Sequence, residues 1–498
     1  MKRRSPVVGA ALFAALVSAC SNTGTSKSGP TDAGGPALRA RPAGPAADVS
    51  ETITGGNGPF IAAATGLVVP DGYVANEYVA AGTATAYQNN GPLTDDGRWS
   101  FDTTTGAAYR TRVLVLRPAS AAKASGTVLV EWLNVSGGAD ADPEYASLVE
   151  EITRQGHTWI GVSAQLIGVE GGPVLVSVPD AGGLPGKGLK GIDPARYGSL
   201  VHPGDGYSFD IFTQVARAVL KGGAILGDAK PKVVLAVGES QSAFALTTYY
   251  DGVQPLTRAF DGFLIHSRGA TSLPLVSAGA SADLAGSIGS VTHPLFRDDL
   301  DVPVMDIQTE GDVVGLLSSG VVRQPDSDRF RLWEVAGTAH ADAHLLGPAA
   351  SGIDCGVPVN NGPMHLVVKS AFRGLDTWVR TGTLPLVAPR LDLSEDGATP
   401  TLQRNNDGIA IGGVRTPPVD VPVDVLSGAP GPSTSVICLL LGSTTPLPPA
   451  RLAALYPNRA AYETQYDDDA DQTIKAGFVL EPDRDALLAF AQPSRIIP

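Results

Sequence analysis

The sequence predicts an α/β protein in which a mostly parallel β-sheet carries helices on both faces. Short runs of β-branched and other apolar residues recur along the chain, as expected for strands that are buried on both faces. Segments with helical spacing of apolar residues separate these runs, and this alternation is typical of parallel sheets. The chain has 498 residues, of which 43% are hydrophobic, so it can build a large core.

The most informative segment is PKVVLAVGESQSAFALTTYY, around Ser240. Residues 232–237 predict a buried strand, and the AFAL further on can begin a helix. Ser240 therefore stands at a sharp strand-to-helix turn, which is the context of a nucleophile elbow. Such a turn needs small residues two positions before and two after the serine. Gly238 meets this need and Ser242 stands where glycine is usual. An ordinary turn with a solvated serine is the alternative.

The other elements follow in order along the chain. Strands are expected at residues 73–87 and 109–117, as an antiparallel opening pair, and at 126–132, 157–164, 260–265, 302–308 and 329–335. Helices are expected at 143–154, 208–220, 362–381, 451–466 and 469–492. The alternation ends near Leu384. We therefore expect a core over 51–385, with insertions near 165–207 and 267–301, and a C-terminal extension of the same unit over 386–498.

The N-terminus has the features of an export signal. Three basic residues, KRR, precede the apolar residues 6–17, a stretch too short to span a bilayer. The LVSAC that follows resembles the end of a bacterial lipoprotein signal. Residues 1–19 are therefore expected to be removed and Cys20 to carry a lipid anchor, with ordinary cleavage after Ala19 and secretion as the alternative. Residues 20–50, rich in Gly, Ala, Pro and Ser, are expected to form a disordered tether.

Composition narrows the classes of partner. The formal net charge is −14, and no cluster of Lys and Arg appears after the N-terminus, which argues against nucleic acid. His344 lies four residues after His340, a spacing that can bind zinc, but no third ligand is fixed nearby, so no metal and no cofactor are expected. Besides Cys20 the chain has Cys355 and Cys438. In an oxidising compartment these two cysteines can form a disulfide, and the alternative is that both are buried free thiols.

A serine nucleophile needs a base, and the base needs an acid that orients it. The strand at 302–308 is followed by TEGD, which ends in Asp312, and the strand at 329–335 by AGTAH, which ends in His340. Both turns lie where a doubly wound hydrolase sheet presents these groups, in the chain order Ser, acid, His. Glu310, two residues before Asp312, is the competing acid.

These segments resemble the α/β-hydrolase superfamily. GESQS is similar to its elbow, PVMDIQTEGD to its acid turn and WEVAGTAH to its histidine turn. More closely, the chain resembles a bacterial family called alpha/beta hydrolase domain proteins, through DPARYGSLVHPGD, RLWEVAGTAHAD, NNGPMH and GGVRTP, over residues 55–491. The resemblance implies the α/β-hydrolase fold and a triad of Ser240, Asp312 and His340. It implies no substrate.

The sequence thus predicts an exported serine hydrolase that cleaves a small-molecule carboxylic ester and reaches the membrane through its lipid anchor. The expected oxyanion donors are the backbone N–H groups of Gln241 and of the loop containing Asn134 and Val135. The two insertions are expected to roof the site. A serine amidase or peptidase would use the same three residues. A cell-surface binding lipoprotein without turnover is the alternative from a different class, and a metal-dependent hydrolase using the two histidines is a third.

Overall fold

The computed structural model describes residues 41–498, apart from 178–183, 185, 291, 395–399 and 497–498. The described residues belong to one compact unit, Arg39–Pro498. The export signal expected at 1–19 and the lipidated Cys20 lie outside the described residues. Within the described part, no helix is both long enough and apolar enough to cross a bilayer.

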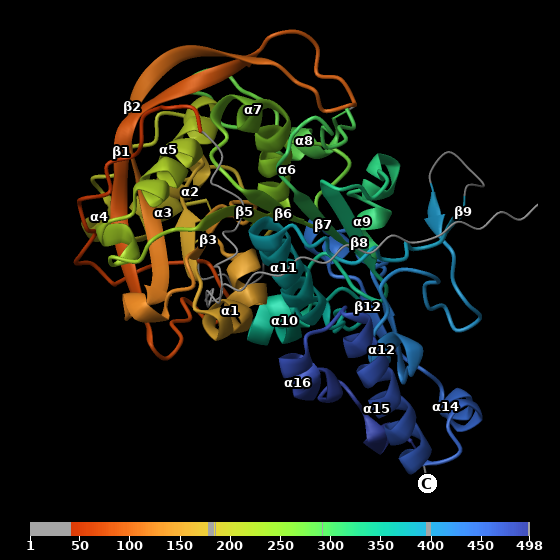
Figure 1. Cartoon of the computed structure of the whole chain (residues 1–498). Coiled ribbons are helices and arrows are strands. Elements are labelled where there is room, and N and C mark those ends of the chain that lie inside the picture. Colours follow the sequence, from red (N-terminus) through yellow and green to blue (C-terminus); the bar gives the residue numbers. More distant parts are fainter. Residues whose placement is uncertain (1–40, 178–183, 185, 291, 395–399, 497–498) are drawn as a thin grey trace, which may run out of the picture. The chain divides into compact units, whose positions relative to one another are not determined.

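The centre of this unit is an eight-stranded sheet with the strand order β1-β2-β4-β3-β5-β6-β7-β8 (Figure 1). The pairs β1–β2 and β2–β4 are antiparallel, and all the other pairs of the sheet are parallel. The strands are β1 (Tyr73–Asn89), β2 (Phe101–Pro118), β3 (Thr127–Trp132), β4 (Thr158–Val162), β5 (Val233–Glu239), β6 (Gly262–His266), β7 (Val304–Thr309) and β8 (Phe330–Val335). The predicted α/β class with a mostly parallel sheet is confirmed.

Helices cover both faces of the sheet, as Figure 1 shows for α5 and α6 on one side and α1 and α11 on the other. The two faces have separate hydrophobic cores, and alternate residues of β3 enter them: Val128 and Val130 pack with α5 and α6, while Leu129 packs with α1 and α11. The α-helices up to this point are α1 (Pro143–Gln155), α2 (Leu166–Glu170), α3 (Gly188–Ile192), α4 (Pro194–Tyr197), α5 (Ser208–Lys221), α6 (Gln241–Thr248), α7 (Gln254–Thr257), α8 (Leu284–Ile288), α9 (Glu310–Val313), α10 (Ala343–Leu346) and α11 (Met364–Thr381).

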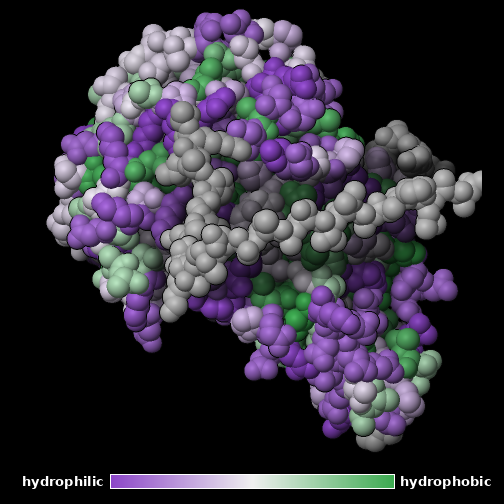
Figure 2. All heavy atoms as spheres, in the orientation of Figure 1, coloured by the Kyte–Doolittle hydropathy of each residue, from purple (hydrophilic) through white to green (hydrophobic). Residues whose placement is uncertain are grey.

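The C-terminal residues form short elements that pack within the same unit. They are β9 (Leu393–Ser394), β10 (Thr401–Leu402), α12 (Pro417–Asp420), β11 (Asp424–Ser427), α13 (Val436–Leu440), β12 (Ser443–Pro446), α14 (Pro449–Leu455), α15 (Arg459–Ala476) and α16 (Arg484–Leu488). The helices expected at 451–466 and 469–492 are wrong in their boundaries. One helix, α15, crosses the expected break, because Tyr462, Tyr466, Ala470 and Thr473 form one buried stripe. Its opposite side is charged, and the region of α15 is mainly hydrophilic in Figure 2.

Two boundaries near the N-terminus also differ from the expectation. The tether expected over 20–50 is wrong for residues 41–50, because the Ala47 N–H donates to the Gln214 carbonyl and Asp48 bridges to Ala81 of β1. The second strand begins at Phe101 rather than near 109. The polar residues 102–106 give no apolar signal, yet their backbone continues the pairing with β1.

Candidate active site

Ser240 occupies a strained turn between β5 and α6. Its φ is 62° and its ψ is −123°, a conformation that residues with a side chain rarely adopt. A Cβ added to Gly238 would lie 2.9 Å from the Cβ of Ser242, which explains why this turn needs a glycine there. The Ser240 N–H donates to the carbonyl of His266 in β6 over 2.9 Å, so the neighbouring strand holds the turn.

The structure brings Ser240, His340 and Asp312 together at the carboxyl edge of the sheet. The distance from Ser240 Oγ to His340 Nε2 is 2.8 Å, and from His340 Nδ1 to Asp312 Oδ1 it is 2.7 Å. Because an ionised Asp312 can only accept, His340 donates from Nδ1 and its Nε2 can accept the serine proton. Residues 100 positions apart in sequence thus form one continuous hydrogen-bonded chain.

Asp312 is held as a carboxylate. Its second oxygen accepts hydrogen bonds from the N–H and the hydroxyl of Thr309 and from Ser267 Oγ, each over 2.7 Å. Burial raises the pKa of Asp312, but His340 and the bonds from Ser267 and Thr309 outweigh burial and keep the pKa below its usual range. Ser267 and Thr309 were not predicted as site residues. Their position at the ends of β6 and β7 is the only sequence signal for them.

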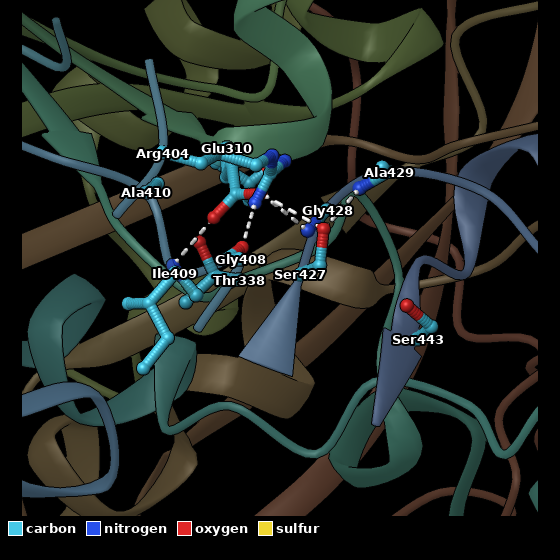
Figure 3. A network of polar contacts seen from close by, with 12 residues as sticks. Glu310, Thr338, Arg404, Gly408, Ile409, Ala410, Ser427, Gly428, Ala429 and Ser443 are labelled. Carbon is cyan, nitrogen blue, oxygen red and sulfur yellow. Dashed lines mark hydrogen bonds and ion pairs between the residues drawn. The ribbon is translucent and has the colours of Figure 1, made fainter. Parts of the chain in front are cut away.

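Glu310, the competing acid, is buried and engaged elsewhere, as Figure 3 shows. Its carboxylate accepts from the N–H of Gly337 at 2.9 Å, from Arg404 Nη2 at 2.5 Å, from Ser427 Oγ at 3.0 Å and from the N–H of Gly428 at 3.0 Å. Three of these donors lie in the C-terminal extension. Glu310 therefore anchors the extension to the turn after β7, while Asp312 faces His340.

The two loop residues expected as oxyanion donors have different surroundings. The N–H of Asn134 donates to the carbonyl of Ala141 over 2.9 Å. This N–H is therefore already paired, and the expectation that Asn134 is an oxyanion donor is corrected. The N–H of Val135 donates over 3.2 Å to the side-chain oxygen of Gln241. The backbone N–H of Gln241 is the first of α6 and has no partner within its helix turn, as at every helix start.

A chain of side chains fixes which way the Gln241 amide points. The indole N–H of Trp132 can only donate, and it donates to Gln165 Oε1 over 2.9 Å. The same oxygen accepts from Gln241 Nε2 over 2.6 Å. The Gln241 oxygen must therefore face Val135, where it accepts the N–H that was expected to be an oxyanion donor.

The expected insertions contact the site and each other. Leu175 and Val176 donate backbone N–H groups to the Ser136 carbonyl, directly beside the loop that carries Val135. The Asp205 N–H donates to the Ala280 carbonyl, which joins the first insertion to the second. The ring of His344 stacks on that of His365, with 3.6 Å between the ring centroids.

Cys355 and Cys438 are joined by a disulfide, with 5.5 Å between their Cα atoms. The bond links the loop after α10 to α13. At the end of α13 the carbonyl of Leu440 accepts the N–H of Ala341, the residue after the triad histidine, over 3.2 Å. Cys438 is therefore two residues before Leu440, which contacts the turn that carries His340.

The sheet order, the elbow after β5, the acid after β7 and the histidine after β8 define the class of α/β hydrolases. The chain belongs to the alpha/beta hydrolase domain family, whose model matches residues 42–489.

Solved structures similar to the chain include two esterases. One is a fungal esterase from Rhizomucor miehei, with 11% identity over 64% of this chain and 86% of that one and a TM-score of 0.33. The other is carboxyl esterase 2 from Tuber melanosporum, with 11% identity over 62% of this chain and 89% of that one and a TM-score of 0.29. The search of curated proteins found no match.

Proposed function

We propose that this protein is a serine hydrolase that cleaves carboxylic esters through an acyl-enzyme on Ser240. The observation that carries the proposal is the unbroken hydrogen-bonded chain from Ser240 Oγ through His340 to Asp312, at 2.8 and 2.7 Å. Its partners lie in the order and at the strand ends that this chemistry uses.

In the first half-reaction, Ser240 Oγ attacks the ester carbonyl carbon while His340 Nε2 takes the hydroxyl proton. Asp312 stabilises the imidazolium that forms and stays ionised. Collapse of the tetrahedral intermediate breaks the bond to the alkoxide, which receives the proton from His340 and leaves as an alcohol. In the second half-reaction, water gives a proton to His340 and attacks the acyl-enzyme, and Ser240 leaves with that proton, which releases the acid.

The negative oxygen of the intermediate is bound by the backbone N–H groups of Gln241 and Val135. A donor of this kind contributes about 3 kcal/mol to the stability of a transition state. Because Val135 donates to the Gln241 side chain, the substrate oxygen must displace that amide oxygen. Gln241 therefore contributes its N–H to the site and keeps the second donor occupied until substrate binds.

The site is proposed to act outside the cytoplasm, with the chain anchored by a lipid on Cys20. The disulfide between Cys355 and Cys438 supports this compartment, because such bonds persist in oxidising surroundings. Replacement of Cys20 by Ala is expected to move the protein from the membrane fraction to the soluble fraction of the envelope. Retention of the Cys20→Ala protein in the membrane fraction would contradict the anchor.

The reaction is tested with p-nitrophenyl esters of increasing acyl length and the matching p-nitroanilides. Wild type should hydrolyse esters, and Ser240→Ala should lower kcat at least 10³-fold. Ser242→Ala is the matched control, because its buried hydroxyl has no hydrogen-bond partner among the described residues. Preferential cleavage of the anilides would replace the esterase proposal by an amidase. Turnover of neither class by folded protein would favour a binding role.

A further inference from the structure

A second group of ionisable side chains lies behind the elbow and plays no part in the serine chemistry. It consists of Glu144 in the first turn of α1, Glu239 at the end of β5 and His266 at the end of β6. All three are buried, with at most 3% of each residue exposed. They are far apart in sequence, and the fold brings them to one point under the turn that carries Ser240.

The distances within this cluster are close to those between ligands of one ion. His266 Nδ1 lies 3.0 Å from Glu144 Oε2 and 3.5 Å from Glu239 Oε2. One ligand atom from each residue lies within 4.8 Å of the other two. Ligand atoms that bind zinc tetrahedrally at about 2.0–2.1 Å are separated by about 3.3 Å. A small shift of the two carboxylates therefore creates a binding position between them and the ring.

The cluster also has unused coordinating atoms. Glu144 Oε1, Glu239 Oε2 and His266 Nε2 are buried and have no hydrogen-bond partner among the described residues. Buried polar atoms usually find partners, and buried carboxylates are usually paired or bound to a metal. Here two carboxylates share one imidazole, so at most one positive charge of the cluster balances two negative charges.

We propose that Glu144, Glu239 and His266 bind a divalent transition-metal ion, with zinc and manganese as the best fits. Two carboxylates and a neutral imidazole balance a divalent cation in charge. Imidazole nitrogen combined with carboxylate oxygen suits these ions, whereas calcium prefers six to eight oxygen ligands.

A proton on His266 is the competitor of the metal ion. Such a proton on Nδ1 would be donated to Glu144 Oε2, which lies 3.0 Å away. Metal binding must therefore release a proton. The two occupants give different results in a metal titration, because saturable binding occurs only if the ion displaces this proton.

The ion has a structural role at the base of the elbow. It ties the first turn of α1 to the ends of β5 and β6, next to the bond from the Ser240 N–H to the His266 carbonyl. The reacting hydroxyl of Ser240 is instead bonded to His340. The inference therefore does not depend on the esterase proposal, and its test does not use turnover.

The test is a metal titration of the full chain after treatment with a chelator, with zinc alone and manganese alone. Calorimetry and elemental analysis should show one ion per chain for at least one of the two metals, and loading should raise the melting temperature. Glu144→Gln and His266→Gln should each weaken that binding at least tenfold. The control is His344→Gln, which removes the stacked surface histidine and should bind as wild type does.

Two outcomes would overturn the proposal. One is wild-type protein that shows no saturable site and the same melting temperature with and without metal. The other is binding that survives in Glu144→Gln but is lost in His344→Gln, which would place the ion at the histidine stack. If Glu144→Gln does not fold, the Glu239→Gln variant serves in its place and should show the same loss of binding.

Discussion

At the scale of single residues, the turn after β7 assigns two acids to two tasks. Asp312 accepts from His340, Ser267 and Thr309, so its charge faces the base. Glu310 accepts from groups of the β8 turn and the C-terminal extension. The sequence places both acids in TEGD and favours Asp312 only by position. The donors that separate their tasks are up to 118 residues away, so no local pattern reveals them.

The two acids are expected to respond differently to neutralisation. Asp312→Asn should lower kcat by about 10⁴-fold with little loss of stability, because His340 loses its orienting acceptor. Glu310→Gln should keep most of the kcat of folded protein but lower the free energy of unfolding by about 3 kcal/mol, because Arg404 loses its buried partner. Steady-state kinetics and urea unfolding measure the two effects. A larger fall in kcat for Glu310→Gln than for Asp312→Asn would reverse the assignment.

His157 is expected to make the protein sensitive to acid. Burial lowers its pKa to about 4, while the unfolded chain binds the proton near pH 6.5. The unfolded state therefore takes up more protons between these values, and stability present above pH 6.5 is lost as the pH falls towards 4. The loss from this residue is about 3 kcal/mol.

His157→Gln should make the unfolding free energy depend less steeply on pH between 6.5 and 4 in urea titrations. The amide retains a polar group beside Ser125, which contacts His157 Nδ1 at 2.7 Å in the wild type. Equal pH dependence of the two proteins would show that this histidine is not the acid-sensitive group.

At the scale of elements, the existence of the strands was easier to predict than the residues at which strands and helices begin and end. All eight strands of the sheet were expected, because β-branched apolar runs such as VVLAV have a direct signature. The start of β2 was missed because its outer half is polar. The break expected within α15 lies at Asp467 and Asp468, which are exposed on a continuous helix.

The residues of the candidate site also differed in whether the sequence carries a signature for them. Ser240, Asp312 and His340 each follow a recognisable strand, so their convergence could be expected. Asn134 and Val135 are neighbours in the sequence, which does not show which of their N–H groups is available. Only the structure shows that the Asn134 N–H is paired with the Ala141 carbonyl. Ser267 and Gln165 have no motif, since both act through contacts that only the tertiary structure creates.

The disulfide between the loop after α10 and α13 is expected to support the histidine turn. It closes a separation of 83 residues, and its loss should lower the free energy of unfolding by about 3 kcal/mol. The double variant Cys355→Ser/Cys438→Ser should therefore unfold at lower urea than wild type. Its kcat should also fall, because α13 accepts the N–H of Ala341. A double variant as stable as wild type would mean that packing alone holds this region.

At the scale of the whole described unit, the C-terminal extension is part of the hydrolase body. Arg404, Ser427 and Gly428 bind Glu310, and Val479 and Leu487 pack into the core on the α1 and α11 face. Asn360 adds a link, because its amide donates to the carbonyls of Gly337 and Ser427. The turn that carries Asp312 is thus supported by the C-terminal extension.

Removal of the extension should prevent folding. A chain that ends at residue 385 leaves Glu310 buried without Arg404, Ser427 and Gly428, and exposes apolar core residues. We expect no cooperative unfolding transition by circular dichroism. Full-length Ser427→Ala, which removes a single hydroxyl from this network, is the control and should unfold cooperatively. A truncated chain that folds and turns over esters would make the extension a separate module.

The central claim is that Ser240 is a nucleophile activated by His340 and Asp312. The most direct measurement is labelling with a fluorophosphonate, followed by peptide mass spectrometry. We predict one phosphonyl group per chain on the peptide that contains Ser240, retained in Ser242→Ala and absent in Ser240→Ala and His340→Ala. Folded wild-type protein that stays unlabelled, or that carries the label on another serine, would contradict the account.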